Sequence, residues 1–314
     1  MRTLNDYELL YRVAHYYFIN GYSQIDISRM ENLSRPQVSR MIARARELGM
    51  VRVEVLPYQN SDLSPLEDRL RRRLGIDAVH IFPADKPDSP DSRFISALGA
   101  WLSRELPQFR RIGLARSRTV YRVSFRLIPQ NVGDGMCFTP LQGNAGTNIP
   151  WLQSSSILDR FASNFNAEAV FTQCSVLTPT EALDTPLEQE RFRLLQSGWN
   201  DLDAALFGIG AKPDFNSSFI REVVGPVYPE LLNMDPTGDL FGSYFDENGK
   251  MFDSPAGYTL VSFPVSDLRT IPHAICVAAG AEKAQAICVA ARQGYIKTLA
   301  VDETAAYALL RQTE

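Results

Sequence analysis

The sequence predicts two parts: an N-terminal all-α helix-turn-helix domain, and a C-terminal α/β domain whose mainly parallel sheet carries helices on both faces. The first part is predicted by three capped helical segments within residues 4–50. The second is predicted by short apolar runs that alternate with helical stretches from about residue 77 onward. A length of 314 residues also fits about two domains. We expect the helix-turn-helix domain at 1–56, a linker at 57–65 and the α/β domain at 66–314.

Composition limits the class of protein. The net charge of −4 means that any contact with nucleic acid comes from a local basic patch. No secretory signal is visible, and no run reaches the roughly 18 apolar residues of a membrane span, so we expect a soluble, cytoplasmic protein. The cysteines stand singly in apolar runs, which predicts buried thiols, with no metal site and no cofactor. They are Cys137, Cys174, Cys276 and Cys288.

The first domain is read from its helix ends. Residues 4–20 carry apolar side chains at helical spacing, and Gly21 is placed to end that helix. Ser23 is a good N-cap for a short second helix in which Ile25 and Ile27 turn partly inward. Ser34 caps a third helix that has Pro36 in its first turn and Gly49 at its end. The segment 51–57, VRVEVLP, alternates like a short wing or an exit strand.

The third helix has a basic face opposite its apolar stripe. Between positions 29 and 52 there are six arginines and two glutamates. Arginine and glutamine match the edges of guanine and adenine, so this face predicts binding to double-stranded operator DNA. Proteins of this design pair two copies across half-sites, and we expect a homodimer or homotetramer. The expected DNA-binding residues are Ser34, Arg35, Gln37, Ser39, Arg40 and Arg44.

The second domain has eight strand candidates separated, for the most part, by helices. The candidates are AVHIF, RIGLA, MCFTPL, AVFTQCSV, AALFGIG, YTLVSF, AICVAA and TLAV. A segment with an ENGK turn, DLFGSYFDENGKMFD, predicts a hairpin appended to the sheet. Before the first strand, LEDRLRRRLG predicts a charged helix whose arginines are solvated or lie near DNA.

Polar residues follow several of these strands. Ligands of open parallel sheets bind beyond the carboxyl ends of the strands, so these residues form the expected effector site. The set suits a polyhydroxylated anion such as a sugar phosphate or a sugar acid. It comprises Arg116, Ser117, Arg118 and Thr119, then Gln142, Gly143 and Asn144, then Gly210 and Lys212, then Gly280, Glu282 and Lys283, with Asp239 from the hairpin.

The chain resembles the SorC family of bacterial transcriptional regulators, within the wider DeoR-like group. The resemblance starts in the helix-turn-helix and continues through LFGIG, GDLFGSYFDENG, AAGAEKAQAI and TLAVDETAAYALL. It implies an effector domain related to sugar-phosphate isomerases of the glucosamine-6-phosphate deaminase and ribose-5-phosphate isomerase type. It also implies an oligomer whose grip on an operator changes when a phosphorylated sugar or related metabolite binds. The acidic residue of the GD-x-x-G motif and the lysine of the G-x-E-K-A motif, here Asp239 and Lys283, are implied effector contacts.

The loop GLARSRTVYR at 113–122 departs from the family pattern. The family loop is glycine-rich and followed by a threonine, which lets backbone N–H groups hold a phosphate. This chain keeps Thr119 but carries Ala115, Arg116, Ser117 and Arg118 before it. Three interpretations stay open: the arginines replace the backbone as partners of an anion, they point into an interface beside a drifted or unused pocket, or they contact DNA.

An enzyme is the alternative from another class. Aldose–ketose isomerisation needs a positioned base and acid, and Asp239 is the candidate base. No nearby histidine or glutamate makes an evident partner for it, and an enzyme leaves the helix-turn-helix unexplained. We therefore expect a regulator without catalytic activity.

Overall fold

The computed structural model describes residues 4–51, 62–85, 92–132, 135–145, 149–214 and 233–313. The chain divides into two compact units, Met1–Val55 and Leu56–Glu314. The expected wing lies outside the described residues except for Val51, and so does the first part of the expected linker.

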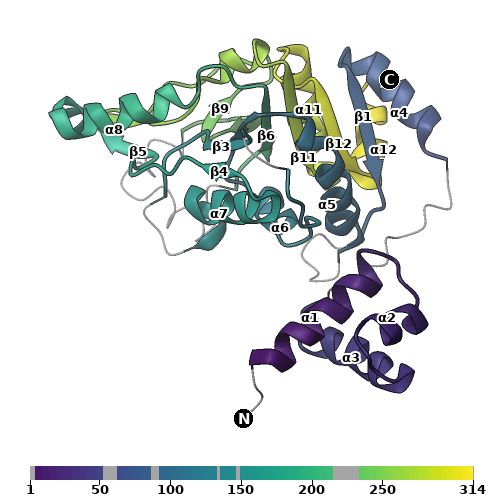
Figure 1. The fold of residues 1–314 in the computed structure, drawn as a ribbon. Coiled ribbons are helices and arrows are strands. Elements are labelled where there is room, and N and C mark those ends of the chain that lie inside the picture. Colours follow the sequence, from purple (N-terminus) through teal and green to yellow (C-terminus); the bar gives the residue numbers. More distant parts are fainter. Residues whose placement is uncertain are drawn as a thin grey trace. The chain divides into compact units, whose positions relative to one another are not determined.

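The N-terminal unit is a three-helix bundle with capped helices (Figure 1). Its helices are α1 (Leu4–Phe18), α2 (Gln24–Met30) and α3 (Arg35–Glu47). The Ser23 hydroxyl accepts a hydrogen bond from the N–H of Asp26 and caps α2. Ser34 and Gln37 form a reciprocal capping box at the start of α3, as two polar residues three apart can do at a helix N-terminus. The predicted N-caps of both helices are confirmed.

A small core holds this bundle together. Val13, Ile27, Val38 and Ile42 are buried against one another, one or two from each helix. Ile25 differs from the expectation, because its side chain is 47% exposed. On a helix of seven residues a single inward row is enough to contact the core, and Ile27 supplies it.

The C-terminal unit is built on a seven-stranded sheet in which every neighbouring pair is parallel. The order is β1 (Ala78–Phe82), β12 (Thr298–Asp302), β11 (His273–Ala278), β6 (Ala204–Gly208), β2 (Arg111–Leu114), β3 (Cys137–Pro140) and β4 (Glu168–Ala169). The predicted α/β class, with a helical N-terminal part, is confirmed.

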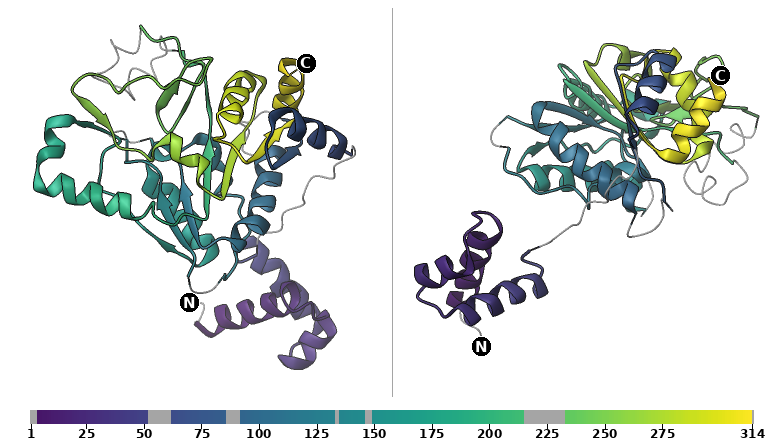
Figure 2. Two further views of the ribbon diagram at one scale, coloured as in Figure 1. Left: turned by 90° about the horizontal axis from the view of Figure 1, so that it is seen from above. Right: turned by 90° about the vertical axis from the view of Figure 1, so that its right-hand side faces the viewer.

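Helices cover both faces of this sheet, as Figures 1 and 2 show. One face carries α5 (Arg93–Glu105), α6 (Arg118–Val123) and α7 (Ser154–Phe165). The other carries α4 (Ser64–Leu74), α11 (Ala284–Arg292) and α12 (Glu303–Gln312), and α8 (Pro186–Ser197) contributes to the same core. The apolar strands are buried on both sides, which explains why they read as continuous hydrophobic runs.

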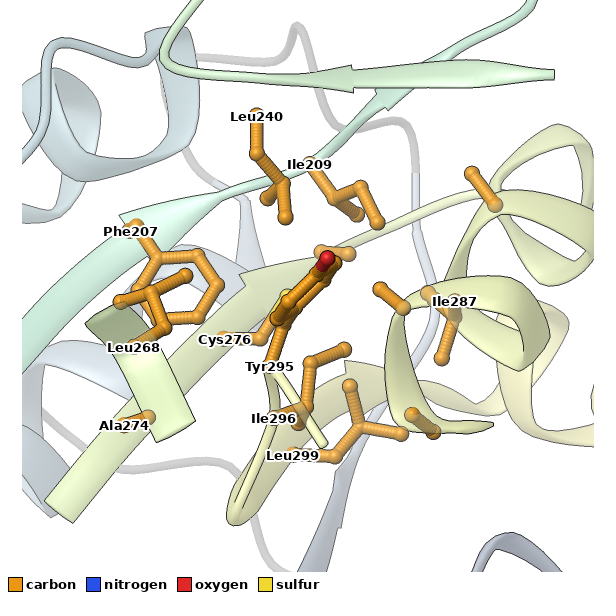
Figure 3. Packing of buried hydrophobic residues seen from close by; sticks show 14 of the residues in the cluster. Phe207, Ile209, Leu240, Leu268, Ala274, Cys276, Ile287, Tyr295, Ile296 and Leu299 are labelled. Carbon is orange, nitrogen blue, oxygen red and sulfur yellow. The ribbon is translucent and has the colours of Figure 1, made fainter. Parts of the chain in front are cut away.

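The larger of the two cores lies between the sheet and α11. Figure 3 shows Phe207 and Cys276 on adjacent strands facing Leu240, Ile287 and Tyr295. The ring of Phe207 is fully buried and meets that of Phe241 edge-on, with 5.6 Å between centroids. Strand β6 therefore anchors the sheet to the segment that carries Asp239.

Two small antiparallel sheets are separate from the main sheet. The sequence had instead predicted that their segments add to the main sheet. β7 (Gly210–Ala211), β8 (Gly238–Leu240) and β9 (Ser243–Phe245) form a three-stranded sheet. Its hairpin turns at Phe241 and Gly242, both with positive φ, whereas the ENGK segment makes a later turn closed by a bridge from Phe245 to Met251. β10 (Tyr258–Leu260) pairs with β5 (Leu177–Pro179) and not with the main sheet.

The expected strand AVFTQCSV, at 169–176, is wrong over most of its length. Only its first residue belongs to a strand, in β4. Val170 N–H still donates to Phe138 O of β3, but further along the backbone bonds to the loop after β3. Asn144 N–H donates to Cys174 O, and Val176 N–H donates to Asn144 O. A tertiary contact thus replaces the ladder that the apolar pattern suggested.

The sheet core yields the first prediction. Phe207→Ala removes a fully buried ring and is expected to lower the free energy of unfolding of the C-terminal unit by about 3–5 kcal/mol. Phe171→Ala is the matched control, because that ring is 57% exposed and its loss is expected to cost within about 0.5 kcal/mol. Urea unfolding followed by tryptophan fluorescence measures both, and equal effects would contradict this placement of the core.

Candidate functional site

The candidate site lies where the strand order of the sheet reverses. β2 pairs in parallel with both β3 and β6. From β2 the chain continues to β3 and β4 on one side, and from β6 it continues to β11 and β12 on the other. The segments that follow β2 and β6 therefore diverge to opposite sides, which opens the crevice where such sheets bind ligands.

The loop after β2 fits closely against the end of β6. Ser117 caps α6, its hydroxyl accepting from the N–H of Val120 at 3.2 Å. A Cβ atom on Gly208 would lie 2.5 Å from that hydroxyl oxygen. The glycine at the end of β6 is therefore needed for the loop to approach, since any larger residue would displace Ser117.

Arg116 turns inward from this loop. Its backbone N–H donates to Gln142 Oε1 at 3.0 Å, and its Nη1 donates to the carbonyl oxygen of Leu152 at 3.2 Å. Its Nε atom is buried and has no hydrogen-bond partner among the described residues. Burial lowers the pKa of the Arg116 guanidinium to about 10, and the nearby Asp239 carboxylate opposes that shift. The guanidinium remains a cation at neutral pH, and it is incompletely partnered.

Gln142 and Asn144 follow β3 on the neighbouring side. The buried Gln142 accepts from Arg116 as above. Asn144 Nδ2 donates to the carbonyl oxygen of Thr172 at 2.9 Å. Its Oδ1 atom is buried and accepts no hydrogen bond from the described residues. A buried donor, Arg116 Nε, and a buried acceptor, Asn144 Oδ1, thus lie on adjoining loops without a hydrogen-bond partner in the part of the chain that the structure describes.

Asp239 and Lys283 approach from the opposite wall. Asp239 lies on β8 across from Gly210, and a Cβ atom on that glycine would come within 1.7 Å of Asp239 Oδ1. Its Oδ2 accepts from the N–H of Gly242 at 3.3 Å. Burial raises the pKa of Asp239, while the Gly242 hydrogen bond, Lys283 and Arg116 oppose the rise. Burial lowers the pKa of Lys283, and Asp239 opposes that shift.

The remaining predicted effector residues divide into two groups. Arg118 is exposed and lies over the ring of Trp151, 5.5 Å from its centroid, and Thr119 is partly buried in the first turn of α6. Lys212 instead pairs with the exposed Asp235, and Glu282 is exposed. The site residues themselves, as effector contacts, stay a prediction.

Three neighbours of the site were missed from the sequence. Tyr244 is the register partner of Asp239, and burial together with that carboxylate raises the pKa of its hydroxyl. Trp151 stacks on Arg118 from a 3₁₀ turn. Asp302, which directly follows the apolar run TLAV, accepts from the N–H of Gly280 at 3.0 Å and holds the turn that precedes Lys283. Only Asp302 had a signal in the sequence, because it ends a strand at the same edge.

The candidate DNA-binding face lies on α3. Arg35, Ser39 and Arg40 are exposed. Gln37 Oε1 is occupied by the capping box, accepting from the N–H of Ser34 at 2.8 Å, so a two-bond contact with adenine would require that box to open. Arg44 is tied to Glu47 at 2.8 Å and lines a groove of about 480 Å³ between α1 and α3. Arg40 is thus the exposed long cation nearest the middle of the face opposite Val38 and Ile42.

Comparisons with known proteins extend over both units. Residues 58–311 match the family described as "Putative sugar-binding domain". The chain belongs to this family. It is 25% identical over 308 residues to the deoxyribonucleoside regulator of Bacillus subtilis, covering 96% of this chain and 97% of that protein. It is 28% identical over 325 residues to the transcriptional regulator LsrR of Escherichia coli K12, covering 97% and 95%.

A solved structure supports the same assignment of the fold. The full-length sorbitol operon regulator SorC of Klebsiella pneumoniae superposes with a TM-score of 0.67 at 24% identity, covering 98% of this chain and all of that one. The resemblance to the SorC family that the motifs indicated is confirmed. Within the described part of the chain, no helix is long and apolar enough to span a membrane, and no cluster of three metal-binding side chains occurs.

An ion pair in the N-terminal unit yields the second prediction. Arg12 donates to both carboxylate oxygens of Glu31, at 2.9 and 2.8 Å, and this lowers the pKa of Glu31. The ionised pair therefore stabilises the fold above the unfolded-state pKa of about 4.3, and the contribution is lost as the pH falls through the lower folded-state pKa. Glu31→Gln should be less stable than the wild type at pH 7, and the difference should shrink below about pH 4.

Hydrogen exchange of the amides in residues 4–51 measures this stability across pH. Glu47→Gln is the control, because it removes an exposed partner of Arg44 and is expected to cost less than about 0.5 kcal/mol. A Glu31→Gln deficit that persists unchanged in acid would show that the ion pair is not its cause.

Proposed function

We propose that the protein is a transcriptional regulator that binds double-stranded operator DNA and whose affinity for the operator is controlled by a small anionic effector, a sugar phosphate or a sugar acid. The observation that carries the proposal is the joining, in one chain, of a helix-turn-helix with an exposed basic face to strand ends lined by partly buried basic residues. Relatives named as regulators match nearly the whole length of the chain.

In this proposal α3 enters the major groove and Arg40 contacts a base edge. The Ser34 capping box fixes the start of α3, so the exposed residues of its first turns have a defined orientation. A single helix of this kind gives little affinity. Two copies spaced about one DNA turn apart would bind both half-sites, which makes a homodimer or homotetramer the expected assembly.

The effector is proposed to lie between the loop after β2 and the wall formed by Asp239 and Lys283. Arg116 and Lys283 are cations in a partly desolvated crevice, where the attraction for an anion is stronger than in water. Asp239 is an acceptor for sugar hydroxyls. Binding that favours one arrangement of the oligomer would then change its affinity for DNA.

Isomerase chemistry is the competing function. The raised pKa of Asp239 is the feature that would suit a general base. The helix-turn-helix has no role in that function, and the relatives above are named as regulators. We therefore propose binding without turnover; conversion of any sugar phosphate by the purified protein would contradict this.

The basic face yields the third prediction. A duplex selected from a random-sequence library by the wild-type protein serves as the operator. Arg40→Ala is expected to weaken binding to that duplex by about 1–3 kcal/mol, because a contact with a base edge is lost, and to weaken binding to a scrambled duplex less. Fluorescence anisotropy at physiological salt measures both affinities.

Arg104→Ala is the matched control, since it removes an exposed arginine from α5 in the other unit. Its operator affinity should equal that of the wild type. Unchanged affinity of Arg40→Ala would show that α3 does not read the operator through this residue.

The effector site yields the fourth prediction. Asp239→Asn and Gly210→Ala should both retain operator binding but lose the response to the effector, the first by removing the carboxylate and the second by forcing it aside. In the wild type an effector is expected to shift operator affinity about 5- to 150-fold. The measurement is the duplex dissociation constant with and without each member of a panel of aldose phosphates and sugar acids.

Asp235→Asn provides the control, because Asp235 is exposed and pairs with Lys212. It should respond like the wild type. If Asp239→Asn and Gly210→Ala respond fully as well, the effector lies elsewhere.

A further inference from the structure

The Arg116 guanidinium is held in place, but no carboxylate among the described residues accepts a hydrogen bond from it. Its hydrogen bond to the described residues goes to a neutral carbonyl group, that of Leu152. Its Nε is buried and has no hydrogen-bond partner in the described parts of the chain. A buried charged donor without a partner costs free energy, so its presence indicates a function for the unpaired atom, such as binding a ligand. An anion that accepts from Nε supplies that reason.

The orphan acceptor beside it adds a second requirement. Asn144 Oδ1 is buried and accepts no hydrogen bond from any residue that the structure describes. Asn144 Nδ2 donates to Thr172 O, so turning the amide over would break that hydrogen bond. Gln142, two residues earlier, accepts from the Arg116 N–H and ties the two loops together. A ligand that satisfies both orphan atoms must offer an acceptor to Arg116 and a donor to Asn144.

The charges around the crevice favour a single negative charge on the ligand. Of the partly buried side chains that line the crevice, Arg116 and Lys283 are basic and Asp239 is acidic. The basic groups thus outnumber the acidic group by one. A carboxylate cancels this difference, whereas a phosphate dianion would leave an uncompensated negative charge in a desolvated site. Arg118 and Glu282 carry opposite charges and are both exposed, so water screens their contributions.

The backbone of the loop is also partly used. A phosphate cradle depends on free backbone N–H groups. Here the N–H of Arg116 is taken by Gln142 Oε1, and that of Val120 is taken by the Ser117 hydroxyl. The planar fork of a guanidinium matches the two oxygens of a carboxylate. These features move recognition from the backbone to the Arg116 side chain.

We propose that the effector is a hydroxylated monocarboxylate, a sugar acid, whose carboxylate accepts hydrogen bonds from the Arg116 guanidinium and whose hydroxyl donates to Asn144 Oδ1. The inference rests on the proposed function, and it narrows the class of effector for the same site. It makes the Arg116 guanidinium the group that holds the acid, while the charge balance of the crevice favours a monocarboxylate over a phosphate dianion.

Calorimetric titration of the full chain tests the class of ligand. The probes are five- and six-carbon aldonates and uronates, the aldose phosphates of the same carbon chains, and the uncharged aldoses. At least one acid is expected to bind, and to bind about tenfold or more tightly than the phosphate of its own carbon chain. A phosphate that binds more tightly than every acid, or the failure of every acid to bind, overturns the inference.

Variants test the role of the guanidinium. Arg116→Lys keeps the positive charge but loses the fork, and it should bind the acid about tenfold or more weakly than the wild type. Arg111→Lys makes the same change at the exposed, opposite end of β2 and should bind like the wild type. Equal binding by Arg116→Lys overturns the inference.

A second variant covers the case in which Arg116→Lys does not fold. Asn144→Asp preserves size but adds a negative charge beside the crevice, so it too should bind the acid about tenfold or more weakly. Binding of the selected duplex, measured in parallel, distinguishes failure of this inference from failure of the proposed function. If the protein binds the selected duplex but the expected preference for the acid is not found, only this inference is contradicted. If the protein binds no duplex sequence-specifically, the proposed function is contradicted.

Discussion

The parallel pairing of β2 with β6 is the constraint on which the rest of the C-terminal unit depends. It brings the ends of two strands together at the point where the chain departs to opposite sides of the sheet. Gly208 lets the loop after β2 close onto β6, and Gly210 leaves room for Asp239 beside the end of β6. With bulkier residues at these two positions the same strands would form, but the polar side chains would be pushed apart.

The site places ionisable side chains in a partly desolvated crevice, where a charge is costly. Burial lowers the pKa values of Arg116 and Lys283 and raises that of Asp239, so each charge destabilises the fold on its own. Their proximity offsets part of that cost, and a bound anion would offset more. A bound anion would therefore offset the free-energy cost of desolvating these charges. Because the charged groups are already in place before binding, the site gains affinity. The large apolar core under β6 and β11 stabilises the fold against this cost.

Local signals made most of the fold predictable, and long-range contacts account for what was missed. The N-caps Ser23 and Ser34 act within three residues of themselves, so the helix-turn-helix could be read directly. Continuous apolar runs marked the buried strands. The segment 170–176 carries the same pattern, but its later part, at Cys174 and Val176, bonds to Asn144 instead of to a strand. β10 pairs with β5, which lies about eighty residues away. Tyr244 and Trp151 reach the site through the register of a hairpin and through a 3₁₀ turn, neither of which leaves a mark in the sequence.

The central claim is that one equilibrium links the anion site to the DNA-binding face. Linkage requires the effect to be reciprocal, whatever contacts transmit it. The most direct measurement is the affinity of the effector for the protein, taken by calorimetry with and without a saturating amount of the selected duplex. DNA is expected to change the effector affinity by the same factor by which the effector changes the DNA affinity. An effector affinity that is identical in the free and DNA-bound protein would contradict it.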